Sequence, residues 1–142
     1  MIDFDNQTQL PIATHMLEQI LAFLGGGDVE LLCVDAQTMR AINKEHRDKD
    51  ETTDVLSFPL ARQVATIPLG TIVLCAEAIT QAAAEFGHST DDEAALLFLH
   101  GLLHLQGYDH ESDNGEQRAK EAEVVAHFGL PQSLIVRADL PC

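Results

Sequence analysis

The stretch AALLFLHGLLHL, residues 94–105, constrains the fold more than any other part of this 142-residue chain. Its first six residues are apolar all round a helix, which is typical of a central helix that is buried on every side. Other elements must therefore cover this helix. About a dozen apolar residues are also too few to span a bilayer, which needs roughly 20. We expect a soluble domain built around this helix.

The rest of the chain alternates between period-two and helical apolar patterns, with glycine and proline at the boundaries. These patterns predict strands at 1–5, 29–35, 53–59 and 69–75, and helices at 9–24, 36–47, 76–86, from 91 or 92 to Gly107, and at 115–128. The fourth helix follows a capping-box pattern, Thr90 to Glu93. No Pro/Gly/Ser-rich linker divides the chain, so residues 1–142 are expected to form one domain. The expected class is α+β, a small mixed sheet of about four strands packed with about five helices.

Three histidines follow one another at spacings of four and six residues near the end of the central helix. His100 and His104 lie one turn apart, so their imidazoles project from one face and can bind the same ion. Gly107 can adopt the left-handed conformation that ends a helix, which lets His110 approach from outside. Three imidazoles with one open position describe a catalytic zinc site. The sequence therefore predicts one zinc ion per chain, on the central helix and the turn after it.

The spacing HxxxHxxGxxH matches the histidines and the glycine of the metzincin zinc-protease signature. Those enzymes place a glutamate directly after the first histidine as the general base, and this chain has Gly101 there. The missing base argues against peptide hydrolysis. Zinc still lowers the pKa of bound water to near 7 without a protein base. A phosphodiester held by an arginine fits such a site, because guanidinium pairs with two phosphate oxygens.

Charge is the feature that fits nucleic acid least, since the chain has 8 basic and 23 acidic residues and a net charge of -15. Four of the eight basic residues, however, fall between Arg40 and Lys49. Arg40, Lys44 and Arg47 share one helix face. Both a solvated face, with acidic residues interleaved, and a functional stripe are consistent with this spacing.

Cysteine usage and the amino terminus bear on the compartment. The three cysteines are an odd number with no CxxC pair, which argues against a disulfide scaffold; Cys33 and Cys75 are expected to be buried thiols, and Cys142 ends the chain. The first residues, MIDFDNQ, carry aspartates where a secretory signal would carry lysines. We expect a cytoplasmic protein that does not contact a membrane.

Several blocks together resemble the YbeY family of bacterial metal-dependent endoribonucleases. They occur in the order of the family and cover most of the chain from Asn43 to Glu123. The blocks are NKEHR at 43–47, TDVLSFP at 53–59, LGTIVL at 69–74, FGHS at 86–89 and HGLLHLQGYDH at 100–110. The histidine block is the most specific of them.

The resemblance implies a single-strand-specific RNase that acts in ribosomal RNA maturation, including the 3′ end of small-subunit rRNA, and in ribosome quality control. It implies zinc held by His100, His104 and His110. The arginine in the family's cleft falls on Arg47, which becomes the candidate for phosphate binding or transition-state stabilisation. The implied partners are single-stranded or ribosomal RNA, ribosomal proteins and the small subunit.

Two positions depart from the family pattern. Thr52 stands where the family usually has proline, and Thr71 stands where it usually has the aspartate of LGD, so a carboxylate is missing there. Thr71 can still form a hydrogen bond. Ser57 is expected to be a hydrogen-bonding residue that lines the cleft. Asp109 either orients a histidine through its second ring nitrogen or caps the turn after Gly107.

Two other functions stay open at this point. One is a ribosome-assembly binding protein with a mainly structural metal, because a net charge of -15 suits contact with basic ribosomal proteins. The other is a metal hydrolase of small phosphoesters or peptides, which needs a general base that the sequence does not offer.

Overall fold

The computed structural model describes residues 1–60, 69–108 and 112–131. Its centre is a four-stranded sheet with the order β1-β2-β4-β3. The strands β1, β2 and β4 are parallel, and β3 runs antiparallel to β4 at one edge. The strands are β1 (Ile2–Asn6), β2 (Val29–Val34), β3 (Val55–Pro59) and β4 (Gly70–Cys75).

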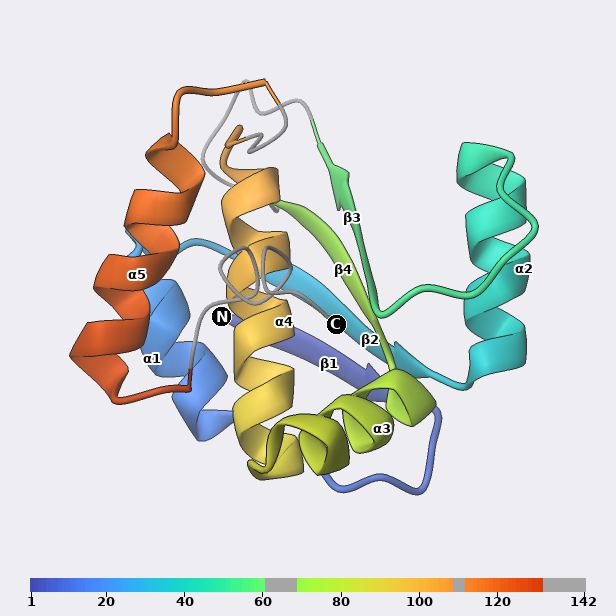
Figure 1. Ribbon diagram of the computed structural model, residues 1–142. Coiled ribbons are helices and arrows are strands. Elements are labelled where there is room, and N and C mark those ends of the chain that lie inside the picture. The colour runs from blue at the N-terminus through green and yellow to red at the C-terminus, as the bar shows by residue number, and fades with distance from the viewer. Residues whose placement is uncertain (61–68, 109–111, 132–142) are drawn as a thin grey trace.

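Helices cover both faces of this sheet, as Figure 1 shows, with α4 in front of one face and α2 beyond the other. The helices α1 and α5 pack beside α4, and α3 leads from the end of β4 to the start of α4. The helices are α1 (His15–Phe23), α2 (Ala36–Arg47), α3 (Ala76–Phe86), α4 (Thr90–Leu105) and α5 (Glu116–Phe128). The predicted α+β class, the mixed four-stranded sheet and the order of the elements are confirmed. None of the helices in the described ranges is long and apolar enough to cross a membrane.

Two predicted helix starts are corrected. The helix predicted at 9–24 begins at His15; Pro11 disfavours a helical conformation at Leu10, and residues 11–14 are not helical. Leu10 and Ile12 still pack against the core, which explains why their spacing suggested a helix. The cap of α4 is Ser89 rather than Thr90, since the Ser89 hydroxyl accepts from the Asp92 N–H at 3.0 Å.

The central helix α4 is buried as predicted. Four consecutive residues, Leu96 to Leu99, are each at most 1% exposed. Its end is a Schellman turn, in which Tyr108 N–H donates to Leu103 and Gly107 N–H donates to His104. Gly107 has a φ of 97°, a conformation that side-chain-bearing residues rarely adopt. The chain therefore turns at Gly107, one turn after the second histidine of the helix.

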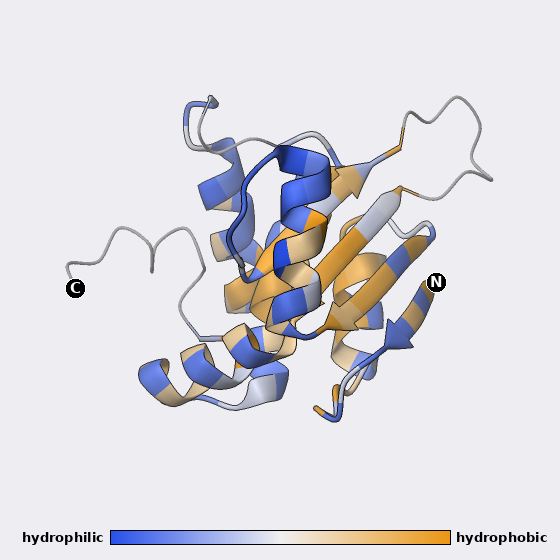
Figure 2. Cartoon of the chain, turned by 90° about the vertical axis from the view of Figure 1, so that its right-hand side faces the viewer, coloured by the Kyte–Doolittle hydropathy of each residue, from blue (hydrophilic) through white to orange (hydrophobic). Residues whose placement is uncertain are grey.

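The sheet separates two apolar clusters, and alternate residues of β4 face each of them. Ile72 and Leu74 belong to the large cluster around α4, whereas Val73 and Cys75 belong to the smaller cluster around α2. Figure 2 looks onto the α2 side, where a mostly hydrophilic helix lies in front of mostly hydrophobic strands. Both described cysteines, Cys33 and Cys75, are buried free thiols as expected, and burial raises the pKa of each; Cys142 lies outside the described residues.

Candidate metal centre

The helix α4 brings two imidazoles together on its face. The Nε2 atoms of His100 and His104 lie 3.1 Å apart, and the two rings meet nearly edge to face, with centroids 4.7 Å apart. Both side chains are partly buried. This is the arrangement that the four-residue spacing predicts, because residues one turn apart lie above one another on a helix.

The two ring nitrogens fit a shared cation. Zinc–nitrogen distances are about 2.0–2.1 Å, so two nitrogens on one ion lie no more than about 4.2 Å apart, and 3.1 Å is within that limit. Imidazole nitrogen is also a donor that zinc prefers. Within residues 1–60, 69–108 and 112–131 no group of three ligating side chains occurs. The predicted third ligand, His110, and its neighbour Asp109 lie outside the described residues.

A carboxylate from α5 contacts the ring nitrogen of His100 that points away from His104. Glu121 Oε2 lies 2.7 Å from His100 Nδ1, and it also accepts a hydrogen bond from Gln117 Nε2 at 3.2 Å. Glu121 and Gln117 are fully buried although both are polar. The other carboxylate oxygen, Oε1, is buried and has no hydrogen-bond partner among the described residues.

Sequence reasoning missed Glu121 and Gln117. A signal was present, because Gln117, Glu121 and Val124 have i, i+4, i+7 spacing and share the buried face of α5. Two polar residues on such a face need polar partners. The partner of Glu121 is 21 residues away on another helix, so the sequence alone does not identify it.

Gly101 lies where α4 packs against β3 and β4. A Cβ at this position would be 2.9 Å from Ser57 Oγ and 3.1 Å from Ile72 Cγ2. Ser57 Oγ donates to the carbonyl oxygen of Gly101 at 3.1 Å, which ties β3 to the helix between the two histidines. A side chain after His100 would have to displace Ser57 Oγ and press on Ile72, so a glutamate at this position meets a steric obstacle.

Two other candidates lie on the far side of the sheet from the histidines. Thr71 faces the α2 side, where its hydroxyl donates to Glu30 Oε2 at 3.2 Å. Arg47 is exposed at the end of α2. The structure therefore brings His100, His104 and Ser57 together on one side of the sheet, and places Thr71 and Arg47 on the other side.

The basic stripe on α2 is not uniform. Arg40 Nε donates to Asp50 Oδ1 at 2.7 Å, and this hydrogen bond holds the pKa of Asp50 below its ordinary value. The loop after the helix is fastened by Asn43 Nδ2, which donates to the Glu51 carbonyl at 2.9 Å. Arg47 lies in the segment that these two hydrogen bonds close, and its side chain is exposed.

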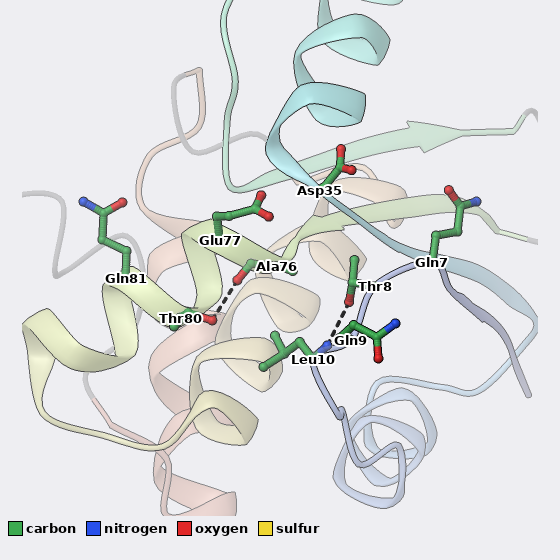
Figure 3. Close-up of a pocket in the computed structure, with 9 residues that line it drawn as sticks. All are labelled: Gln7, Thr8, Gln9, Leu10, Asp35, Ala76, Glu77, Thr80 and Gln81. Carbon is green, nitrogen blue, oxygen red and sulfur yellow. Dashed lines mark hydrogen bonds between the residues drawn. The ribbon is translucent and has the colours of Figure 1, made fainter.

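A hollow lined mostly by polar residues lies at the other end of the sheet from the histidine pair, and Figure 3 shows its lining. It lies past the last residues of the parallel strands, whereas Leu105, next to His104, packs at the first residue of β4. Both of its carboxylates bind the start of α2, since Asp35 accepts from Thr38 N–H and Glu77 from Ala36 N–H. These carboxylates have a structural role.

Comparison with known proteins agrees with the resemblance in the motifs. The family model described as endoribonuclease YbeY matches residues 2–129. Endoribonuclease YbeY of Sulfurimonas denitrificans is 51% identical over 139 residues, covering 98% of this chain and 99% of that protein. The Wolinella succinogenes protein of the same name is 54% identical with the same coverage. That of Campylobacter jejuni is 53% identical over 121 residues, covering 85% of this chain and 90% of its own.

The fold also matches a solved structure. The solution structure of TM1509 from Thermotoga maritima has a TM-score of 0.57 and 26% sequence identity, and the match covers 91% of this chain and 92% of that one. A match by family model over nearly the whole chain, together with relatives at about half identity, shows the family. This chain belongs to the YbeY family of endoribonucleases.

Proposed function

We propose that this protein is a zinc-dependent endoribonuclease that cleaves single-stranded RNA in the cytoplasm. Its proposed role is ribosomal RNA maturation, including the 3′ end of small-subunit rRNA, and ribosome quality control, with ribosomal proteins and the small subunit as partners. The observation that carries the proposal is the pair of converging Nε2 atoms of His100 and His104, 3.1 Å apart, in a chain of this family. The family name supports RNA cleavage, and the donor set supports the metal.

The proposed ligands are His100, His104 and, from the sequence pattern, His110. Zinc bound there supplies a Lewis acid for a phosphoryl oxygen and lowers the pKa of water toward neutrality. Ser57 holds the helix between the ligands against β3, through its bond to the Gly101 carbonyl. Because residue 101 is a glycine, the chain has no carboxylate at the position where zinc proteases have their general base.

Arg47 is the proposed phosphate-binding residue. Its guanidinium is exposed, always charged and able to pair with two phosphate oxygens. Because α2 and α4 lie on opposite faces of the sheet, one RNA strand that contacts both Arg47 and the histidines has to pass around the sheet, and the edge strand β3 offers such a route. The attacking group is a water molecule or the RNA 2′-hydroxyl. Attack by the 2′-hydroxyl leaves a 2′,3′-cyclic phosphate and a 5′-hydroxyl, so the product ends distinguish the two.

The test combines bound-zinc stoichiometry with cleavage of a single-stranded RNA. We expect one zinc per wild-type chain, loss of zinc and cleavage in His104→Ala, and retained zinc with reduced cleavage in Arg47→Ala. The matched controls are His15→Ala, which removes an exposed histidine on α1, and Arg40→Ala, which removes an arginine on the same helix. Unchanged cleavage in His104→Ala would exclude the metal from the mechanism.

The net charge of -15 favours one other function, a ribosome-assembly binding protein whose metal is structural. That function predicts ribosome association that survives Arg47→Ala, together with no metal-dependent cleavage by the pure protein. The cleavage assay on wild type and on Arg47→Ala, together with a ribosome-association assay, therefore decides between the endoribonuclease and the binding protein.

A further inference from the structure

We propose that Glu121 is the positioning residue of the metal centre: it fixes the ring orientation and the tautomer of His100. This inference rests on the proposed function in one respect, that His100 binds a metal ion. Glu121 lies on α5, outside the helix that carries the two histidines, and does not itself belong to the predicted ligand set.

The hydrogen bonds around Glu121 assign the proton on His100. An ionised carboxylate only accepts hydrogen bonds, and Oε2 already accepts one from Gln117 Nε2 at 3.2 Å. With Glu121 as the acceptor, the 2.7 Å contact to His100 is an Nδ1–H donating to Oε2. In neutral imidazole the other nitrogen then has no proton. The lone pair of His100 Nε2 is thus directed toward His104 Nε2, at the place where a metal ion would be shared.

Burial strengthens the effect of the hydrogen bond between Glu121 and His100. The Glu121 side chain is 1% exposed and that of His100 is 12% exposed, so water does not compete for the bond. The second oxygen of Glu121 has no hydrogen-bond partner among the described residues, which is costly for a buried carboxylate. A nearby cation would offset that cost, and the carboxylate would increase the basicity of a metal-bound imidazole.

Glu121 also limits the movement of the ring. His100 is attached to α4 and Glu121 to α5, so the bond between them holds the imidazole from the side opposite the metal position. Gln117, one turn before Glu121 on the same helix, holds the carboxylate in turn. The two hydrogen bonds that join Gln117, Glu121 and His100 therefore connect the buried face of α5 to the proposed metal position.

The experiment compares wild type with Glu121→Gln, which keeps the size of the side chain and removes its charge. The matched control is Glu123→Gln, the same substitution two residues along on the exposed side of α5. Zinc affinity is measured by competition with a chelator. Removing such a partner of a ligand typically lowers metal affinity 10- to 100-fold. We expect a loss of that size in Glu121→Gln and less than a twofold change in Glu123→Gln.

A second measurement does not depend on metal. The ¹⁵N NMR spectrum of the histidine rings in metal-free protein reports which nitrogen carries the proton. We expect the Nδ1–H tautomer for His100 in wild type and in Glu123→Gln, and an increased Nε2–H population in Glu121→Gln. A residue that only fills space would not alter the tautomer.

The outcomes separate the two proposals. If wild type shows the Nδ1–H tautomer but binds no zinc, the proposed function fails while the assignment of the proton stands. If wild type binds zinc and Glu121→Gln binds it equally well, Glu121 is not the positioning residue. An Nε2–H tautomer in wild type also overturns the inference, and this observation needs no variant to fold.

Discussion

Replacing Gly101 by alanine tests the close contact between α4 and the sheet. The added Cβ would lie 2.9 Å from Ser57 Oγ and 3.1 Å from Ile72 Cγ2. Ser57 can rotate away, but it then loses its hydrogen bond to the Gly101 carbonyl, which is worth about 1 kcal/mol. Ile72 is β-branched and buried, so it moves less easily.

The expected magnitude follows from two opposing terms. Adding a methyl group to a well-packed core costs typically about 1–3 kcal/mol. Alanine in place of glycine stabilises the interior of a helix by about 1 kcal/mol. We expect the free energy of unfolding to fall by roughly 1 kcal/mol, or about 3–4 °C in melting temperature for a chain of this length. Urea unfolding of the metal-free protein measures it.

A double-mutant cycle identifies the obstacle. In a Ser57→Ala background there is no Oγ to displace and no hydrogen bond to lose, so Gly101→Ala should be close to neutral. The coupling between the two positions should be about 1 kcal/mol. If Gly101→Ala instead stabilises the protein by about 1 kcal/mol in both backgrounds, position 101 has room for a side chain. The steric explanation for the missing glutamate would then be wrong.

Two further substitutions test the α2 side of the sheet. Thr71→Asp restores the carboxylate usual in the family, but places it opposite Glu30 on the adjacent strand; we expect a loss of roughly 0.2–1 kcal/mol. Urea unfolding should show this loss disappearing in a Glu30→Gln background, with zinc affinity unchanged. Asp35 accepts from Thr38 N–H at the start of α2, which lowers the pKa of Asp35 below its ordinary 3.8. The charge therefore stabilises the fold above that pH, and its contribution is lost as the pH falls through the lowered value. The stability difference between wild type and Asp35→Asn should accordingly shrink between pH 6 and pH 3 in denaturant titrations.

Local signals predicted much of the fold. The bounds of α2 and α3 match the residue ranges inferred from the sequence, because Asp35 and Gly87 mark the ends where the apolar period stops. The start of α1 was misplaced because an extended segment buries Leu10 and Ile12 at a spacing that a helix would also give. The spacing of apolar residues indicates which residues are buried. It does not indicate whether a helix or an extended segment buries them.

The site was predictable where its parts share one helix. His100 and His104 converge because helical geometry alone fixes their distance. The contact of Glu121 depends on how α5 lies against α4, which no local pattern specifies. Likewise, Ser57 and Thr71 both come from strands of the family motifs, but strand alternation places them on opposite faces. Which face holds the candidate metal centre becomes known only once the helices are placed.

The two outer strands of the sheet have a consequence for association between molecules. Among the strands that the structure describes, β1 and β3 each pair with a single neighbour, and such edges can add a strand from another chain. On β1 the outward residues Asp3 and Asp5 are exposed carboxylates, and β3 is five residues long and ends at Pro59, which has no N–H to donate. Both edges therefore resist extension into fibrils or swapped sheets, and the net charge of -15 adds repulsion between molecules. At these two edges we therefore expect a partner to be recognised through side chains rather than through an added strand.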